Sequence, residues 1–155
     1  NSSFMRYFIA DLAQAEGLEV RHVLSKSKCL SADVTAAYDP TYASAYEAGN
    51  ACYVNNGVGM SKYTGARGKS GTSDASAEFV GEIRRIFDDA GVIWQTSELG
   101  KVDQGGGGTV AKYIANRNID TVDIGVPVLS MHAPFELISK TDLYEAHKAF
   151  SAFCK

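Results

Sequence analysis

An apolar run over residues 119–131 limits the folds open to this chain more than any other feature. Its β-type pattern is typical of a buried strand, and Gly125 and Pro127 predict a bulge or an edge position within it. The run leads into His132, and Pro134 follows two residues later. A histidine held between a buried strand and a proline can aim one imidazole nitrogen at a fixed point. We therefore interpret His132 as a metal ligand; the alternative is a hydrogen-bonded core histidine.

Helical and β-type patterns alternate along the rest of the chain. Helices are predicted over residues 3–16, 73–90 and 109–116 and from Thr141 onward, with a short turn or helix over 18–25. Strands are predicted over residues 29–34, 57–64, 92–96 and 119–131, and loops over 35–51 and 97–108. In a chain of 155 residues, this order favours a single layered α/β domain over an all-α or all-β fold.

Two of the predicted helices have defined ends and faces. Ser73 is the predicted N-cap of the helix over residues 73–90, and Gly91 is its stop. The buried stripe predicted for that helix consists of Ala77, Val80, Ile83, Ile86 and Phe87. Thr141 is the predicted N-cap of the last helix. The apolar face predicted for that helix includes Leu143, His147, Phe150 and Cys154.

Composition and charge exclude several classes of protein. The net charge is −3 without a long run of one sign, so the basic patch of a nucleic-acid-binding protein is absent from the sequence. No apolar run approaches the 18 residues of a membrane-spanning helix. Cys29, Cys52 and Cys154 form no CxxC pair, which argues against a structural zinc knuckle and predicts reduced thiols in a cytoplasmic protein. The chain begins without methionine, and Arg6 and Asp11 interrupt its apolar start, so we expect part of a longer protein rather than a signal peptide.

Three further features are candidates for a site. Asp33 lies at the end of a predicted strand. It is either a turn or cap residue or a carboxylate ligand for a zinc-like ion. The glycine run over residues 105–108 is either a linker or the backbone wall of a binding site. In the second case its amides, together with the N-terminus of the following helix, could bind a carbonyl or carboxylate oxygen. Residues 65–71 resemble a phosphate-binding loop, but Tyr63 stands where the signature requires glycine, which leaves nucleotide binding as the weakest reading. No third metal ligand has comparable placement, since His22 and His147 are structural by default.

Four segments together carry a resemblance to a known family. They read LSADVTAA at residues 30–37, KYTG at 62–65, GKVDQGGGGT at 100–109 and VLSMHAPFE at 128–136. In this order and spacing they are similar to the aspartyl aminopeptidase family, which comprises dinuclear zinc exopeptidases related to vacuolar aminopeptidase I, and most of all to its bacterial branch. The likeness extends from about Phe4 to Phe153. It implies an α/β fold, a three-layer α/β/α zinc-exopeptidase (phosphorylase/hydrolase-like) domain with a mixed sheet.

The resemblance also implies roles for individual residues. Asp33 matches an aspartate that holds one zinc ion, and His132 matches a histidine that holds the other. Gly106, Gly107 and Gly108 match a backbone segment that lines the substrate site. Lys62 matches a lysine near the specificity pocket, where a positive charge suits an acidic N-terminal side chain (Asp or Glu).

The family's remaining metal ligands and its general-base glutamate match nothing in this chain and are expected upstream of it. Residues 1–155 therefore resemble the C-terminal part of the catalytic domain, with the N-terminal catalytic segment and the dimerisation domain absent. The implied protein is a cytoplasmic metalloaminopeptidase with two Zn²⁺ ions, or other divalent metals, per complete site. We expect it to act on peptides only together with its missing N-terminal part, within a homo-oligomer for which the family implies a dodecamer. The alternative is a non-catalytic subunit or scaffold that keeps the peptidase fold.

Overall fold

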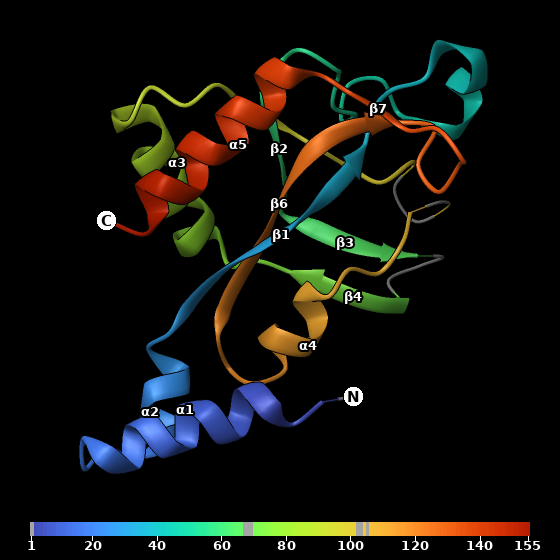
Figure 1. Ribbon diagram of the computed structural model, residues 1–155. Helices are drawn as coiled ribbons and strands as arrows, with labels where there is room; N and C mark the ends of the chain where they lie inside the picture. The colour runs from blue at the N-terminus through green and yellow to red at the C-terminus, as the bar shows by residue number, and fades with distance from the viewer. Residues whose placement is uncertain (1, 67–69, 102–103, 105) are drawn as a thin grey trace.

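A five-stranded mixed sheet lies at the centre of the fold (Figure 1). Its main strands, in spatial order, are β1 (Lys28–Ala36), β6 (Asp120–Leu129), β2 (Val58–Ser61) and β5 (Trp94–Thr96). The short β7 (Leu137–Ile138) pairs with the end of β6. Strand β1 runs parallel to β6 and β2 runs parallel to β5, whereas β2 and β6 are antiparallel. This computed structural model, which describes residues 2–66, 70–101, 104 and 106–155, confirms the predicted α/β class and mixed sheet.

Helices cover both faces of the sheet and make three layers. Along β6, Val122, Ile124 and Val126 point into one apolar core, which they share with α3 (Ala77–Asp89) and α5 (Lys140–Phe153). The intervening residues of β6 face the opposite side, where α4 (Ala111–Ala115) contacts the strand. Figure 1 shows α3 and α5 on one side of the sheet and α4 on the other. The alternation follows from the two-residue period of a β-strand.

A two-stranded hairpin replaces the glycine-rich loop predicted over residues 65–71. Strand β3 (Tyr63–Ala66) pairs with β4 (Ser70–Asp74), and the intervening residues 67–69 lie outside the described part of the chain. Ser73 is therefore a strand residue, opposite Thr64, and not a helix cap. The N-cap of α3 is Ser76, whose Oγ accepts a hydrogen bond from the Phe79 amide at 3.2 Å. The glycine-rich segment thus leads into strand β4, whereas a phosphate-binding loop leads directly into a helix.

The first two helices lie apart from the sheet, at the bottom of Figure 1. Helix α1 (Phe4–Ala15) ends before Gly17, which has a φ of 65°, and α2 (Val20–Ser25) follows. Both were predicted. Helix α1 exposes a stripe of large apolar side chains at helical spacing: Phe4, Phe8 and Leu12. None of the helices in the described residues has the length and hydropathy to cross a membrane.

Strand β1 is longer than predicted and carries Asp33 inside it. The strand continues to Ala36, so Asp33 lies three residues before its end, opposite Gly125 on β6. Residues 32–34 are exposed, and β1 is an edge strand. The loop that follows contains a 3₁₀ helix, η1 (Pro40–Ala45).

Strand β6 is central, although Gly125 and Pro127 predicted a bulge or an edge position. On the side away from β1, pairing with β2 reaches only to Gly125, and pairing with β7 begins at Val128. Pro127 lies between these two ladders, where no strand among the described residues pairs with that side of β6. A central strand therefore tolerates a proline at this position.

The buried face of α5 differs from the prediction except at Phe150, which packs against the core. Leu143 is 52 % exposed, and His147 and Cys154 are also exposed, whereas the buried residues are Asp142, Glu145, Ala146 and Ala149. The two buried carboxylates accept hydrogen bonds from the backbone amides of residues 55, 57 and 93, at 2.6–2.8 Å. These bonds offset the cost of burying charge, so the acidic side of the helix faces inward. The N-cap is Ser139, not Thr141, because its Oγ accepts from the Thr141 amide.

Candidate functional site

One pocket, of about 440 Å³, contains most of the predicted site residues. Four segments form it: the C-terminal half of β1, the loop before α4, the end of η1, and the turn after β6. Asp33, His132 and Gly106–Gly108 all line this pocket. The remaining lining residues are Val34, Ala36, Ala45, Tyr46, Leu99, Gly100, Thr109 and Met131. Residues that are far apart in sequence thus meet as the family resemblance implies, while Lys62 does not line the pocket.

The carboxylate of Asp33 is oriented by its own strand. Asp33 Oδ1 accepts a hydrogen bond from the Val34 amide at 2.8 Å. Behind it, β6 lies close to β1 because residue 125 is glycine: a Cβ there would lie 2.9 Å from the Asp33 carbonyl oxygen and 3.0 Å from the Thr35 nitrogen. Gly125 therefore allows β1 to pack closely against β6 at the position of Asp33.

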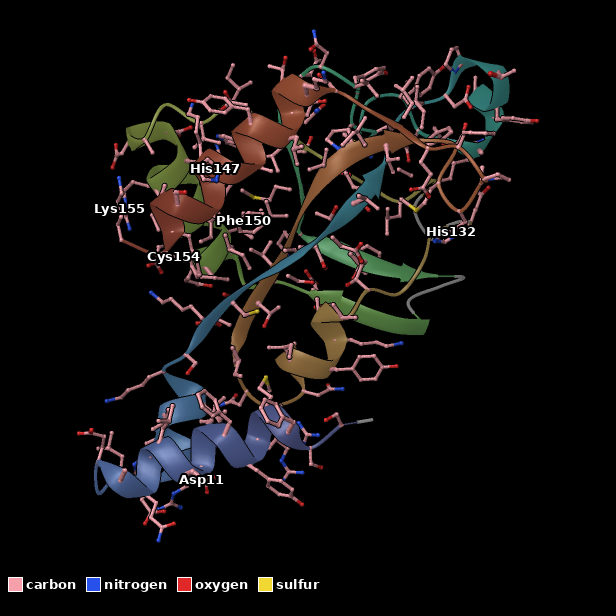
Figure 2. All side chains as sticks on the ribbon, viewed as in Figure 1. Asp11, His132, His147, Phe150, Cys154 and Lys155 are labelled. Carbon is pink, nitrogen blue, oxygen red and sulfur yellow. The ribbon has the colours of Figure 1, made fainter. Side chains whose placement is uncertain are left out.

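His132 lies in a tight turn with unusual backbone geometry. Both Ser130 and His132 have positive φ angles, of 59° and 67°, which are uncommon for residues other than glycine. The His132 amide donates a hydrogen bond to Glu136 Oε1 at 2.6 Å, which fixes the turn. Figure 2 shows His132 far from His147 on α5, so these two imidazoles cannot share an ion. Side chains held in such strained turns are frequent at functional sites.

The glycine segment, residues 106–108, forms another wall of the pocket. Gly106 has a φ of 90°, and a Cβ there would collide with the carbonyl oxygens of Gly65 and Leu99. Only glycine fits where the chain passes between these two backbones. The run was predicted to open directly onto a helix, but α4 begins only at Ala111 and is five residues long. The wall therefore offers its own backbone amides rather than a helix N-terminus; Gly105, the first residue of the run, lies outside the described residues.

Lys62, the predicted specificity residue, is engaged elsewhere. Its Nζ forms an ion pair with Asp74 Oδ1 at 2.5 Å, between side chains that are each about half exposed. Exposed pairs of this kind are weak, so the lysine is not locked in place by this contact.

The donor set at the pocket fits part of a zinc centre. Asp33 supplies carboxylate oxygen and His132 supplies imidazole nitrogen, and both are ordinary zinc ligands. A catalytic zinc takes about three protein ligands and keeps one open position. Within residues 2–66, 70–101, 104 and 106–155, no group of three or more His, Cys, Asp or Glu side chains is placed to hold a metal ion. Among the described residues, the pocket thus offers two groups that zinc can bind, fewer than a complete centre needs.

A buried acid behind the pocket escaped the sequence reasoning. Asp123 on β6 is only 7 % exposed, and its Oδ2 accepts a hydrogen bond from Thr109 Oγ1 at 2.9 Å. Burial raises the pKa of this carboxyl above its ordinary value, by more than the neighbouring hydroxyls lower it, and the charge of Asp33 adds to the rise. The sequence signal for this site was an aspartate within the apolar run of residues 119–131, and the strand prediction assigned it no role.

Known proteins are similar to this chain in both sequence and structure. Residues 1–154 match the family of aminopeptidase I zinc metalloproteases (M18). The chain is 47 % identical to a probable M18 family aminopeptidase 1 of Clostridium acetobutylicum, over 98 % of the chain and 34 % of that protein. It is 50 % identical to a protein described in the same words from Thermotoga maritima, over 83 % of the chain and 28 % of that protein.

Two solved structures superpose on nearly the whole chain. The crystal structure of aminopeptidase I from C. acetobutylicum matches with a TM-score of 0.91 and 46 % identity, over 100 % of this chain and 34 % of that one. The M18 aminopeptidase of T. maritima matches with a TM-score of 0.90 and 42 % identity, over 97 % and 35 %. The chain thus spans about a third of the length of the relatives it matches.

Proposed function

The chain belongs to the aminopeptidase I (M18) family of zinc metalloproteases, and from this we propose that it forms part of a zinc aminopeptidase that removes the N-terminal residue of peptides. One observation carries the proposal: Asp33, His132 and the glycine wall, which lie up to about 100 residues apart in sequence, line a single pocket. An oxygen ligand, a nitrogen ligand and a backbone wall are the parts that such a site requires.

Each part has a task that its chemistry allows. Asp33 and His132 would each hold a zinc ion, and zinc bound there would polarise a peptide carbonyl and lower the pKa of a bound water. The glycine wall lets a peptide backbone approach closely, because no side chain intervenes at Gly106–Gly108. Apart from Asp33, no carboxylate among the described residues lines the pocket. We infer that the proton acceptor for the water belongs to the rest of the enzyme.

The complete enzyme is then the chain together with the two thirds that its relatives have in addition. We infer that residues 1–155 are the C-terminal part of the catalytic domain and act only with the remaining part, with two metal ions per complete site. A homo-oligomer, with a dodecamer as the specific hypothesis, and a cytoplasmic location complete the proposal. The location is supported by Cys29, Cys52 and Cys154, which are all free thiols.

The preference for an acidic N-terminal residue rests on Lys62. The Lys62–Asp74 ion pair would have to open for the lysine to meet a substrate carboxylate. If it does so, Lys62→Met in the complete enzyme lowers kcat/KM for aspartyl substrates by about 10-fold and leaves leucyl substrates unchanged. Asp74→Asn is the matched variant, because it frees the lysine and should not weaken aspartyl cleavage. Equal loss on both substrates would remove the charge-recognition hypothesis.

The metal role of the pocket is tested by ligand variants of the complete enzyme. Asp33→Ala and His132→Ala are expected to lower bound zinc and to reduce kcat/KM by at least about 100-fold. His147→Ala is the control, because that imidazole is exposed on α5 and lies far from His132 (Figure 2). Chelation should abolish activity, and added zinc should restore it. Full zinc content and full activity in His132→Ala would refute the assignment.

A non-catalytic subunit or scaffold is the second candidate. The presence of Asp33, His132 and the glycine wall at one pocket weighs against it, because a scaffold has no need of them. Zinc analysis of the assembled protein separates the two functions: about two ions per site favours the enzyme, and none favours the scaffold.

A further inference from the structure

A layer of buried polar side chains lies in the sheet behind the pocket. Asp123 is at its centre, directly opposite Ser31 on β1 and Ser61 on β2, and both serines are 4 % exposed. A second cavity, of about 10 Å³, is lined by Asp123 and also by Asp33 and Thr109, which line the main pocket as well. The buried carboxyl thus lines the same small cavity as Asp33, one of the two candidate metal ligands.

Thr109 connects this layer to the glycine wall. Its Oγ1 donates to Asp123 Oδ2 at 2.9 Å and accepts from the Ala111 amide at 3.3 Å. Because Thr109 follows Gly108 directly, this hydroxyl holds the end of the glycine segment against the central strand. At the other end, Gly106 is held between the backbones of Gly65 and Leu99. A segment of three glycines would otherwise be the least restrained wall that a pocket could have.

Burying the Asp123 carboxyl costs folding free energy, and packing alone does not explain why an aspartate stands at this position. Asp123 Oδ1 is buried and forms no regular hydrogen bond among the described residues, although the Ser31 hydroxyl is near enough to lower the pKa of the carboxyl. A buried carboxyl with one unpartnered oxygen destabilises a core, and such groups in native proteins call for an explanation. A hydrogen bond to a carboxylate is about twice as strong as one to a neutral acceptor, which makes Asp123 an effective anchor for Thr109.

We propose that Asp123 is a positioning residue, which holds the glycine wall at a fixed distance from Asp33 through the Thr109 hydroxyl. This inference rests on the proposed function, because the wall positions the peptide only if the pocket is an aminopeptidase site. Asp123 itself touches neither the pocket nor the substrate. Its effect is to remove the freedom of residues 106–108 before a peptide binds.

The test compares Thr109→Val, which removes the hydroxyl at nearly constant shape, with Thr109→Ser, which keeps it. In the complete enzyme, Thr109→Val is expected to accelerate amide hydrogen exchange over residues 106–110 by about 10-fold. It should also lower kcat/KM by about 10-fold, mainly through KM, with unchanged zinc content. Thr109→Ser should restore both quantities to within about two-fold.

A merely structural role would lower the melting temperature but leave the kinetics and local exchange of the folded enzyme at wild-type values, and that result would overturn the proposal. If Thr109→Val does not fold, Asp123→Asn keeps the shape but weakens the acceptor, and unchanged exchange over residues 106–110 in that variant would also overturn it. A wild-type enzyme without activity on any aminoacyl substrate would refute the proposed function instead. Hydrogen exchange would still decide whether Asp123 anchors the wall.

Discussion

Replacing Gly106 by alanine should disrupt the pocket wall, and the structure sets the size of the effect. The residue has a φ of 90°, and a Cβ would lie 2.8 Å from the Leu99 oxygen and closer still to that of Gly65. Real Cβ atoms essentially never come within 3.0 Å of such atoms, so the wall must retreat by about half an ångström. The unfavourable backbone angle and the overpacking together amount to about 2–5 kcal/mol of unfolding free energy.

Gly107 provides the matched control one residue away. A Cβ at Gly107 would meet nothing within 4 Å, and its φ is not in the left-handed region. Gly107→Ala should therefore change stability by less than about 0.5 kcal/mol. Urea unfolding of the complete enzyme measures the stability difference, and kcat/KM should also fall by roughly 10-fold or more in Gly106→Ala. Equal stability in the two variants would show that the wall is not held between Gly65 and Leu99, and the reasoning would fail.

Three further predictions concern stability. Asp142→Ala should cost about 3 kcal/mol, because the part-buried Asn55 amide and the buried Gly57 amide lose their charged acceptor; Asp142→Asn should cost less, and equal urea midpoints for both variants would contradict this. The raised pKa of Asp123 means that the folded state binds its proton more tightly than the unfolded state, so its contribution to stability is present below the ordinary carboxyl pKa and is lost as pH rises through the folded pKa. Unfolding measured between about pH 4 and pH 7 should show this decline in the wild type and a smaller one in Asp123→Asn. Gly81→Ala, on the exposed face of α3, should raise stability by about 0.5–1 kcal/mol, since nothing lies near its Cβ position.

Local patterns determined much of the architecture. Helix α1 and its end at Gly17, the existence of α3 and its stop at Gly91, and the buried strand β6 all follow from spacing and from residues that act on their own backbone. The order of these elements was enough for the α/β class. The motifs around Asp33, Lys62, the glycine run and His132 were enough for the family, because four motifs in one order are far more specific than any single one.

The errors have a common cause. Ser73 was taken for a helix cap because a serine before an apolar stripe is the usual signal, but pairing with Thr64 made it a strand residue. The acidic face of α5 turned inward because backbone amides of two other segments needed acceptors, and nothing within the helix sequence carries that information. Pro127 is allowed in a central strand only because β2 stops and β7 starts beside it.

The sequence alone therefore specified the candidate ligands and the flexibility of the wall, because these depend on residue type. The tertiary structure decided that Asp33, His132 and Gly106–Gly108 share one pocket, that Lys62 pairs with Asp74 outside it, and that Asp123 lies behind it. Those relations depend on strand order and register, which join residues about 100 positions apart through contacts that no local pattern encodes.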